Sequence, residues 1–261
     1  MSNETKQIYK ENFTEYLLCL ALDVGEGLVK SGAEIRRVED TIERICTSYG
    51  AVHVEVFSVI SFIHAAVRMP DGSYSVQMRR VKANGTDLHM LERYNSLSRE
   101  ICETKPRLDE FEKKLTVAKK SKAYSFTALL IASIVVTSGF TVFFGGNGYD
   151  CLVASLVGAV IFLIDTLTAR KLNVTAKTFV SSFAASLLAC SLVKLGIGEN
   201  VDAIIIGAFM LLVPGLAFGS AIRDLFYGDL LSGTLKTLQS FMTALMIAFG
   251  YMVAIFVLGG I

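Results

Sequence analysis

Tryptophan is absent from this 261-residue chain, and proline and cysteine are scarce, at three and five residues. The cysteines are widely spaced and form no CxxC pair, which excludes a disulfide scaffold and fits a reduced, cytosolic setting for those in the first half. They are Cys19, Cys46, Cys102, Cys151 and Cys190. The first 13 residues lack the apolar core of a signal peptide, so we expect the N-terminal part to remain in the cytosol.

Charge is also scarce, and it is distributed unevenly. Only 19% of the residues are charged and 52% are hydrophobic, with a mean hydropathy of +0.52, whereas a soluble domain carries about 25% charged residues. Residues 1–122 hold 19 of the 25 Lys and Arg and 18 of the 24 Asp and Glu. We therefore expect a cytosolic domain at 1–120 and a membrane domain at 121–261. The net charge of +1 gives no reason to expect a nucleic-acid partner.

Long charge-free runs fill the second half. A membrane-spanning helix needs about 20 mostly apolar residues, which predicts five spans in contact with the lipid bilayer. The expected spans are 124–144, 151–169, 178–195, 201–220 and 238–260. The second and third are the shortest, and the alternative for them is a helical pair that enters the membrane without crossing it.

Basic residues beside the spans predict the orientation. With the N-terminus inside, ten Lys and Arg residues flank the inner ends, and the outer loops hold Lys194 alone. Five spans then leave the C-terminus outside. We expect a multi-pass α-helical membrane protein with a cytosolic N-terminal α+β domain.

Three positions in the membrane half are candidates for a transport pathway. Pro214 and Gly215 interrupt the fourth span, and a broken helix in hydrocarbon requires protein or water to satisfy its backbone. The alternative is a structural kink. Asp165 lies near the inner end of the second span, where a carboxylate usually faces a bundle interior or an aqueous path. Alternatively, it reaches the interface beside Arg170.

Charged residues also crowd the short apolar segment after the fourth span. They are Arg223, Asp224 and Asp229. Arg223 is suited either to pair with Asp229 or to bind a carboxylate of a substrate. This segment is the best candidate for a gate.

The soluble half predicts a small α+β layer. An apolar stripe predicts a helix over 13–28, Ser31 and Glu34 fit a capping box, and a second helix follows from Ile35 to Tyr49. Alternating valines predict a strand near 52–56, and residues 59–69 and 73–81 predict a hairpin that turns at 70–72. Two more helices are expected at about 87–103 and 106–120.

Signals for catalysis are weak. The three histidines lack zinc-site spacing, and no dinucleotide, phosphate-loop or GxSxG motif occurs, so we predict no catalytic residue, metal site or cofactor. Helix residues 34–40 carry charges of both signs, which usually marks a solvated face. Alternatively, Arg37 or Glu39 faces a substrate or partner.

Two segments resemble the signatures of the threonine/serine exporter family. SGAEIRRVEDTI (Ser31–Ile42), with Glu34, Arg37 and Glu39, is similar to its N-terminal signature, and LLVPGLAFGSAIRDLFYGDLLSG (Leu211–Gly233) is similar to its membrane signature. The resemblance extends from about residue 15 to 258. It implies export of small hydrophilic metabolites across the bacterial cytoplasmic membrane, threonine and serine in the founding members and succinate in some two-subunit members.

Long members of that family have about twice as many spans. The resemblance therefore implies the first subunit of the split form, with a smaller membrane protein of the same family as its partner and a homo-oligomer as a further possibility. Without a nucleotide-binding motif, we expect the proton motive force to drive transport. Two alternatives are a membrane-tethered hydrolase with residues 1–120 catalytic, and an assembly subunit that does not itself transport.

Overall fold

The computed structural model describes residues 12–82, 85–120, 124–168 and 171–259. The chain divides into two compact units. The first, called here the α+β unit, combines Met1–Lys122 with Leu216–Thr237. The second, the helical unit, combines Ala123–Gly215 with Leu238–Ile261. The sequence predicts that 216–237 belongs to the membrane domain, whereas the structure packs this segment with the N-terminal elements.

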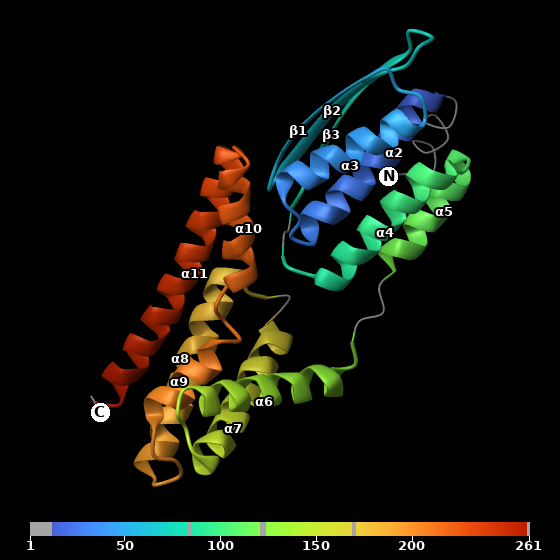
Figure 1. The fold of residues 1–261 in the computed structure, drawn as a ribbon. Helices are drawn as coiled ribbons and strands as arrows, with labels where there is room; N and C mark the ends of the chain where they lie inside the picture. Colours follow the sequence, from blue (N-terminus) through green and yellow to red (C-terminus); the bar gives the residue numbers. More distant parts are fainter. Residues whose placement is uncertain (1–11, 83–84, 121–123, 169–170, 260–261) are drawn as a thin grey trace. The chain divides into compact units, whose positions relative to one another are not determined.

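The sheet of the α+β unit has three antiparallel strands in the order β1-β2-β3 (Figure 1). They are β1 (His53–Val59), β2 (Phe62–Arg68) and β3 (Tyr74–Arg80). Val56 lies opposite Ala65, which lies opposite Gln77, and Gly72 takes a left-handed conformation (φ 85°) between β2 and β3. The predicted hairpin and its turn are thus confirmed.

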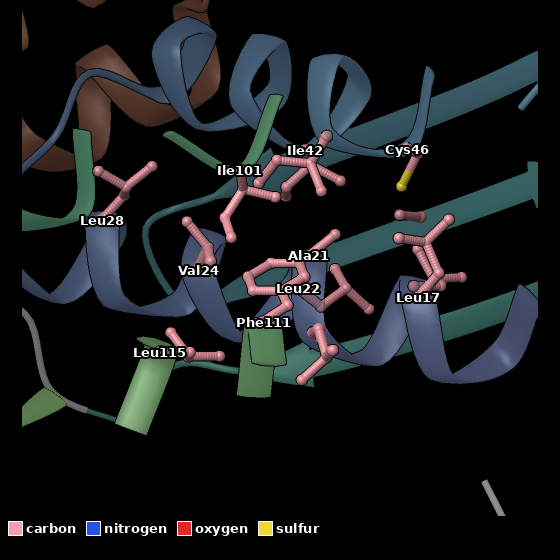
Figure 2. Close-up of a cluster of buried hydrophobic side chains, with 14 of the residues drawn as sticks. Leu17, Ala21, Leu22, Val24, Leu28, Ile42, Cys46, Ile101, Phe111 and Leu115 are labelled. Atoms are coloured by element: carbon pink, nitrogen blue, oxygen red, sulfur yellow. The ribbon is translucent and has the colours of Figure 1, made fainter. Parts of the chain in front are cut away.

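In the N-terminal part, the residues that the structure describes form four helices beside the sheet: α2 (Phe13–Lys30), α3 (Ile35–Ser48), α4 (Leu88–Thr104) and α5 (Leu108–Lys119). Helix α2 lies at the centre, and Figure 2 shows its side chains between those of α3, α4 and α5. Leu17, Leu22 and Leu28 of α2 are fully buried, as are Ile42 and Phe111. Burial of each such side chain contributes about 1.5–3 kcal/mol, which makes α2 the core helix of the unit.

The predicted capping box at Ser31 and Glu34 is wrong. Ser31 instead ends α2 and its hydroxyl donates to the Gly27 carbonyl (2.8 Å). Gly32 then reverses the chain at a φ of 87°, a conformation that only glycine adopts without strain. Helix α3 starts three residues later than the box requires, and the Glu34 side chain makes no capping hydrogen bond.

Four helices of the described residues are long and apolar enough to cross a membrane. They are α6 (Phe126–Phe143), α7 (Gly148–Thr168), α8 (Val174–Lys194) and α11 (Leu230–Val257). The predicted span 201–220 is wrong as a single helix, because α9 (Val201–Phe209) ends before Pro214 and α10 (Gly215–Phe226) begins after it. Proline removes a helical hydrogen bond and clashes with the preceding turn. The count of five spans is not confirmed.

Small polar residues hold the helices of the helical unit together. The Thr137 hydroxyl of α6 donates to the Ala154 carbonyl of α7 (3.0 Å), and that of Ser182 in α8 donates to Ile247 of α11 (2.6 Å). A Cβ atom at Gly250 would lie 2.8 Å from the Phe179 carbonyl. Small residues allow α8 and α11 to approach this closely, which matters in a membrane because lipid supplies no hydrophobic drive for helix pairing.

Candidate functional site

Lys236 and Asp224 form a buried ion pair within the α+β unit. The Lys236 ammonium of α11 is 2.6 Å from Asp224 Oδ2 of α10, and the Asp224 side chain has no solvent exposure. Lys236 Nζ also donates to the Ala33 carbonyl (3.1 Å) and the Ser220 hydroxyl (3.2 Å). The three donor positions of the ammonium are therefore satisfied, as a buried cation requires.

Asp224 also caps helix α3. Its Oδ1 accepts a hydrogen bond from the Ile35 amide at 3.2 Å, where the first free N–H groups of the helix carry partial positive charge. Both carboxylate oxygens are thus occupied by groups far apart in the sequence. We call Glu34, Ile35, Arg223, Asp224 and Lys236 the signature cluster.

Arg223 contributes a second, more exposed ion pair. Its Nη1 donates to Glu34 Oε1 at 2.7 Å, and the two side chains are 61% and 18% exposed. The sequence left open whether Arg223 pairs with Asp229, and the structure gives it Glu34 instead. An exposed pair of this kind contributes about 0–1 kcal/mol, so a competing carboxylate can displace Glu34 at small cost.

Glu39 and Asp229 are two half-buried carboxyl groups whose pKa values are both raised. Glu39 Oε1 accepts hydrogen bonds from the Ser58 amide (2.7 Å) and hydroxyl (3.1 Å). Burial raises the pKa of Glu39, the Ser58 hydrogen bonds oppose this shift, and the charge of Asp229 adds to it. Burial also raises the pKa of Asp229, as does Asp224, while Arg36 and Lys236 oppose the shift. Both groups therefore take up a proton more readily than an exposed carboxyl.

The remaining signature arginines have different roles. The Arg36 guanidinium lies 5.3 Å from the centre of the Tyr227 ring, a cation–π contact that adds to the packing of α3 against the end of α10. Arg37 lies outside the signature cluster and lines a cavity between α3 and α4. Of the three N-terminal candidates, Glu34 belongs to the cluster, and Glu39 accepts hydrogen bonds from Ser58.

The other candidates lie in the helical unit. Asp165, in the last turn of α7, is 2.5 Å from Lys177 Nζ of α8 and is 56% exposed. Arg170, the alternative neighbour of Asp165, lies outside the described residues. Pro214 and Gly215 form the junction of α9 and α10, where the Gly215 amide donates to the Val213 carbonyl (2.9 Å). A Cβ at Gly215 would contact no described atom.

Three partners in and beside the cluster could not be predicted from the sequence. They are Lys236, the Ile35 amide and the Ser220 hydroxyl. Residues 224 and 236 stand on two helices separated by a turn at Gly228, so helical periodicity does not bring them together. Among the described residues, no group of three or more His, Cys, Asp or Glu side chains is placed to hold a metal ion.

The long apolar helices α6, α7, α8 and α11, together with an α+β unit, define a multi-pass membrane protein. The chain belongs to the threonine/serine exporter family (ThrE), whose profile matches residues 19–258, nearly the whole sequence. This is a family of transporters, and the match includes both segments that meet in the signature cluster. No curated protein and no solved structure matches the chain.

Proposed function

We propose that the protein is a secondary transporter that exports small hydrophilic metabolites, threonine and serine above all, and that the proton motive force drives it. The observation that supports the proposal is the signature cluster, in which Asp224 of the second family segment caps α3 of the first and Arg223 pairs with Glu34. We place the protein in the bacterial cytoplasmic membrane, with the N-terminus inside and the C-terminus outside.

The cluster is suited to transmit movement. Helix α10 and the first two turns of α11 belong to the α+β unit, and the division falls at Gly215–Leu216 and at Thr237–Leu238. Pro214 and Gly215 supply a joint at the first of these points, because proline and glycine interrupt helical hydrogen bonding. In the proposal, α10 moves with the α+β unit when the transporter changes state.

Charges in and beside the cluster supply the chemistry. Arg223 would release Glu34 and bind the carboxylate of the substrate. Asp229 and Glu39 would exchange a proton, since burial favours their protonated forms. Asp165 would take part only if its pair with Lys177 opens during the cycle.

A second, smaller membrane subunit of the same family would complete the transport path. Gly215 and Gly219 of α10 form a GxxxG pair, and a Cβ at either position would contact no described atom. Such a face allows a helix of a partner to approach closely. Membership of a transporter family favours this function over a tethered hydrolase.

Transport into inside-out vesicles tests the proposal. Vesicles that contain the chain and its companion subunit should accumulate labelled threonine during respiration, and a protonophore should abolish this uptake. Arg223→Ala should lower the initial rate by about tenfold or more, because a charge-assisted hydrogen bond to the substrate is lost. Arg80→Ala, at an exposed position of β3, is the matched control.

Exchanging the charges of Glu34 and Arg223 tests whether Arg223 binds the substrate or only pairs with Glu34. In the Glu34→Arg, Arg223→Glu double variant the ion pair is kept, but the position that meets the substrate carries the wrong sign. We expect this variant to remain inactive. Full activity in the double variant or in Arg223→Ala would contradict the role of Arg223, and uptake that resists the protonophore would contradict proton coupling.

A further inference from the structure

A polar cavity of about 490 Å³ lies between α3 and α4 in the α+β unit. Three arginines and two carboxylates line it, together with the amide of Asn95 and the hydroxyl of Ser98. None of its lining residues belongs to the signature cluster. A cavity with convergent polar groups is a candidate ligand site, and its charges indicate the kind of ligand.

Two of the three arginines are already engaged. Arg44 Nε is 3.0 Å from Asp40 Oδ1, one turn away on α3. Arg99 lies 3.9 Å from Glu92 and donates to the Ser96 hydroxyl at 2.9 Å. Arg37 forms no salt bridge within the part of the chain that the structure describes. Its guanidinium is therefore the one suited to bind an incoming carboxylate, with two donors in a planar fork.

Asp40 supplies an opposite charge beside Arg37. The two residues are three positions apart on α3, so they are neighbours on one face of the helix, and both line the cavity. Arg44 occupies Asp40 Oδ1, and the second oxygen makes no hydrogen bond among the described residues. A cation and an anion on adjacent turns complement a ligand that carries a carboxylate and an ammonium on the same carbon atom.

We propose that this cavity binds a free α-amino acid with a small polar side chain, with its carboxylate on Arg37 and its ammonium on Asp40. Asn95 and Ser98 would meet the side-chain hydroxyl. A dicarboxylate is disfavoured, because its second carboxylate would meet Asp40 in the ammonium position, while Arg44 and Arg99 already have partners. The site is separate from the proposed transport site. It lies on the helix whose first turn is capped by Asp224, so bound ligand is positioned to act on the signature cluster.

Calorimetric titration of the full-length protein in detergent tests this site with three probes: threonine, succinate and inorganic phosphate. We expect threonine to bind and the two anions to bind at least tenfold more weakly. Arg37→Gln should weaken threonine binding by about tenfold or more, through the loss of a charge-assisted pair. Asp40→Asn should weaken threonine and strengthen succinate, because it removes the repulsion. Arg80→Gln, an exposed arginine of β3, should change neither.

The outcomes separate this proposal from the transport proposal. Binding of threonine should survive Arg223→Ala, the variant that tests transport. Absence of threonine binding, equal binding of succinate or phosphate, or unchanged binding in Arg37→Gln would overturn the amino-acid site. Loss of threonine binding in Arg223→Ala with full binding in Arg37→Gln would place the ligand at the transport site and overturn it as well.

Discussion

Asp224 is the most deeply buried charged residue of the signature cluster. Its carboxylate has no solvent exposure, and its two oxygens bind the Lys236 ammonium and the Ile35 amide. Removing a charge from water costs several kcal/mol, and only a close partner with further hydrogen bonds offsets this cost. The pair therefore ties α3, α10 and α11 to one another, and neither charge tolerates the loss of its partner.

Removal of one partner should be far more harmful than removal of both. Lys236→Met leaves Asp224 as a buried, unpaired charge and should destabilise the α+β unit by about 3–5 kcal/mol. Adding Asp224→Asn to that variant should recover most of the loss. Calorimetric unfolding of the purified protein measures both effects, with Lys113→Met at an exposed position of α5 as the control. Equal stability of the single and double variants would show that the unpaired Asp224 charge is not the cause of the loss.

At the scale of elements, the structure depends on close approach between neighbouring helices. Gly25 and Gly27 both lie on the buried face of α2. A Cβ at Gly27 would overlap the Tyr94 ring of α4, whereas one at Gly25 would lie 2.6 Å from Ile42 Cδ1, the end of a flexible side chain. Gly27 therefore faces a rigid aromatic ring, whereas Gly25 faces a flexible aliphatic side chain.

This difference predicts unequal costs for the same substitution. Gly27→Ala should destabilise the protein by about 1–3 kcal/mol, because overpacking forces the rigid ring and α4 to shift. Gly25→Ala should cost less, since Ile42 can change rotamer and alanine favours the helix by about 1 kcal/mol. Thermal unfolding of the two variants compares them directly. A larger loss for Gly25→Ala would contradict the packing around Tyr94.

At the scale of the whole molecule, the topology depends on the interrupted segment α9–α10. Among the described residues, four continuous helices are each long enough to cross the membrane, and an even number of crossings returns the chain to the side on which it started. If α9 and α10 together form a fifth, broken crossing, the C-terminus lies outside. The positive flanks of the spans favour this arrangement.

Thiol labelling in intact cells tests the topology. In a variant whose native cysteines are replaced, Gly259→Cys should react with a membrane-impermeant maleimide from the outside, since the proposal has five crossings. Thr86→Cys in the α+β unit should react only after the cells are opened, which makes it the internal control. Protection of Cys at position 259 until lysis would favour four crossings and contradict the proposed orientation.

Local patterns in the sequence were sufficient to predict the strands and the first helices of the α+β unit. Alternating valines predicted β1, the Pro-Asp-Gly turn predicted the β2–β3 hairpin, and helical spacing predicted α2 and α3. The prediction of a capping box at Ser31 was wrong because Ser31 ends α2, and Gly32 then reverses the chain before α3 begins. The prediction of one continuous helix for the fourth span was wrong, although the sequence does indicate an interruption at Pro214 and Gly215.

The sequence alone determined the membrane class, the α+β character of the first 120 residues and the break at Pro214, because these properties depend on composition and on neighbours along the chain. Only the tertiary structure decided which charges pair. Arg223 binds Glu34, and Asp224 binds Lys236 while it caps α3 at Ile35. Ile35 and Glu34 lie 189 residues before their partners Asp224 and Arg223, so spacing along the chain does not reveal these contacts. The cost of burying the Asp224 charge without an opposite one selects Lys236, and that burial depends on the folded chain.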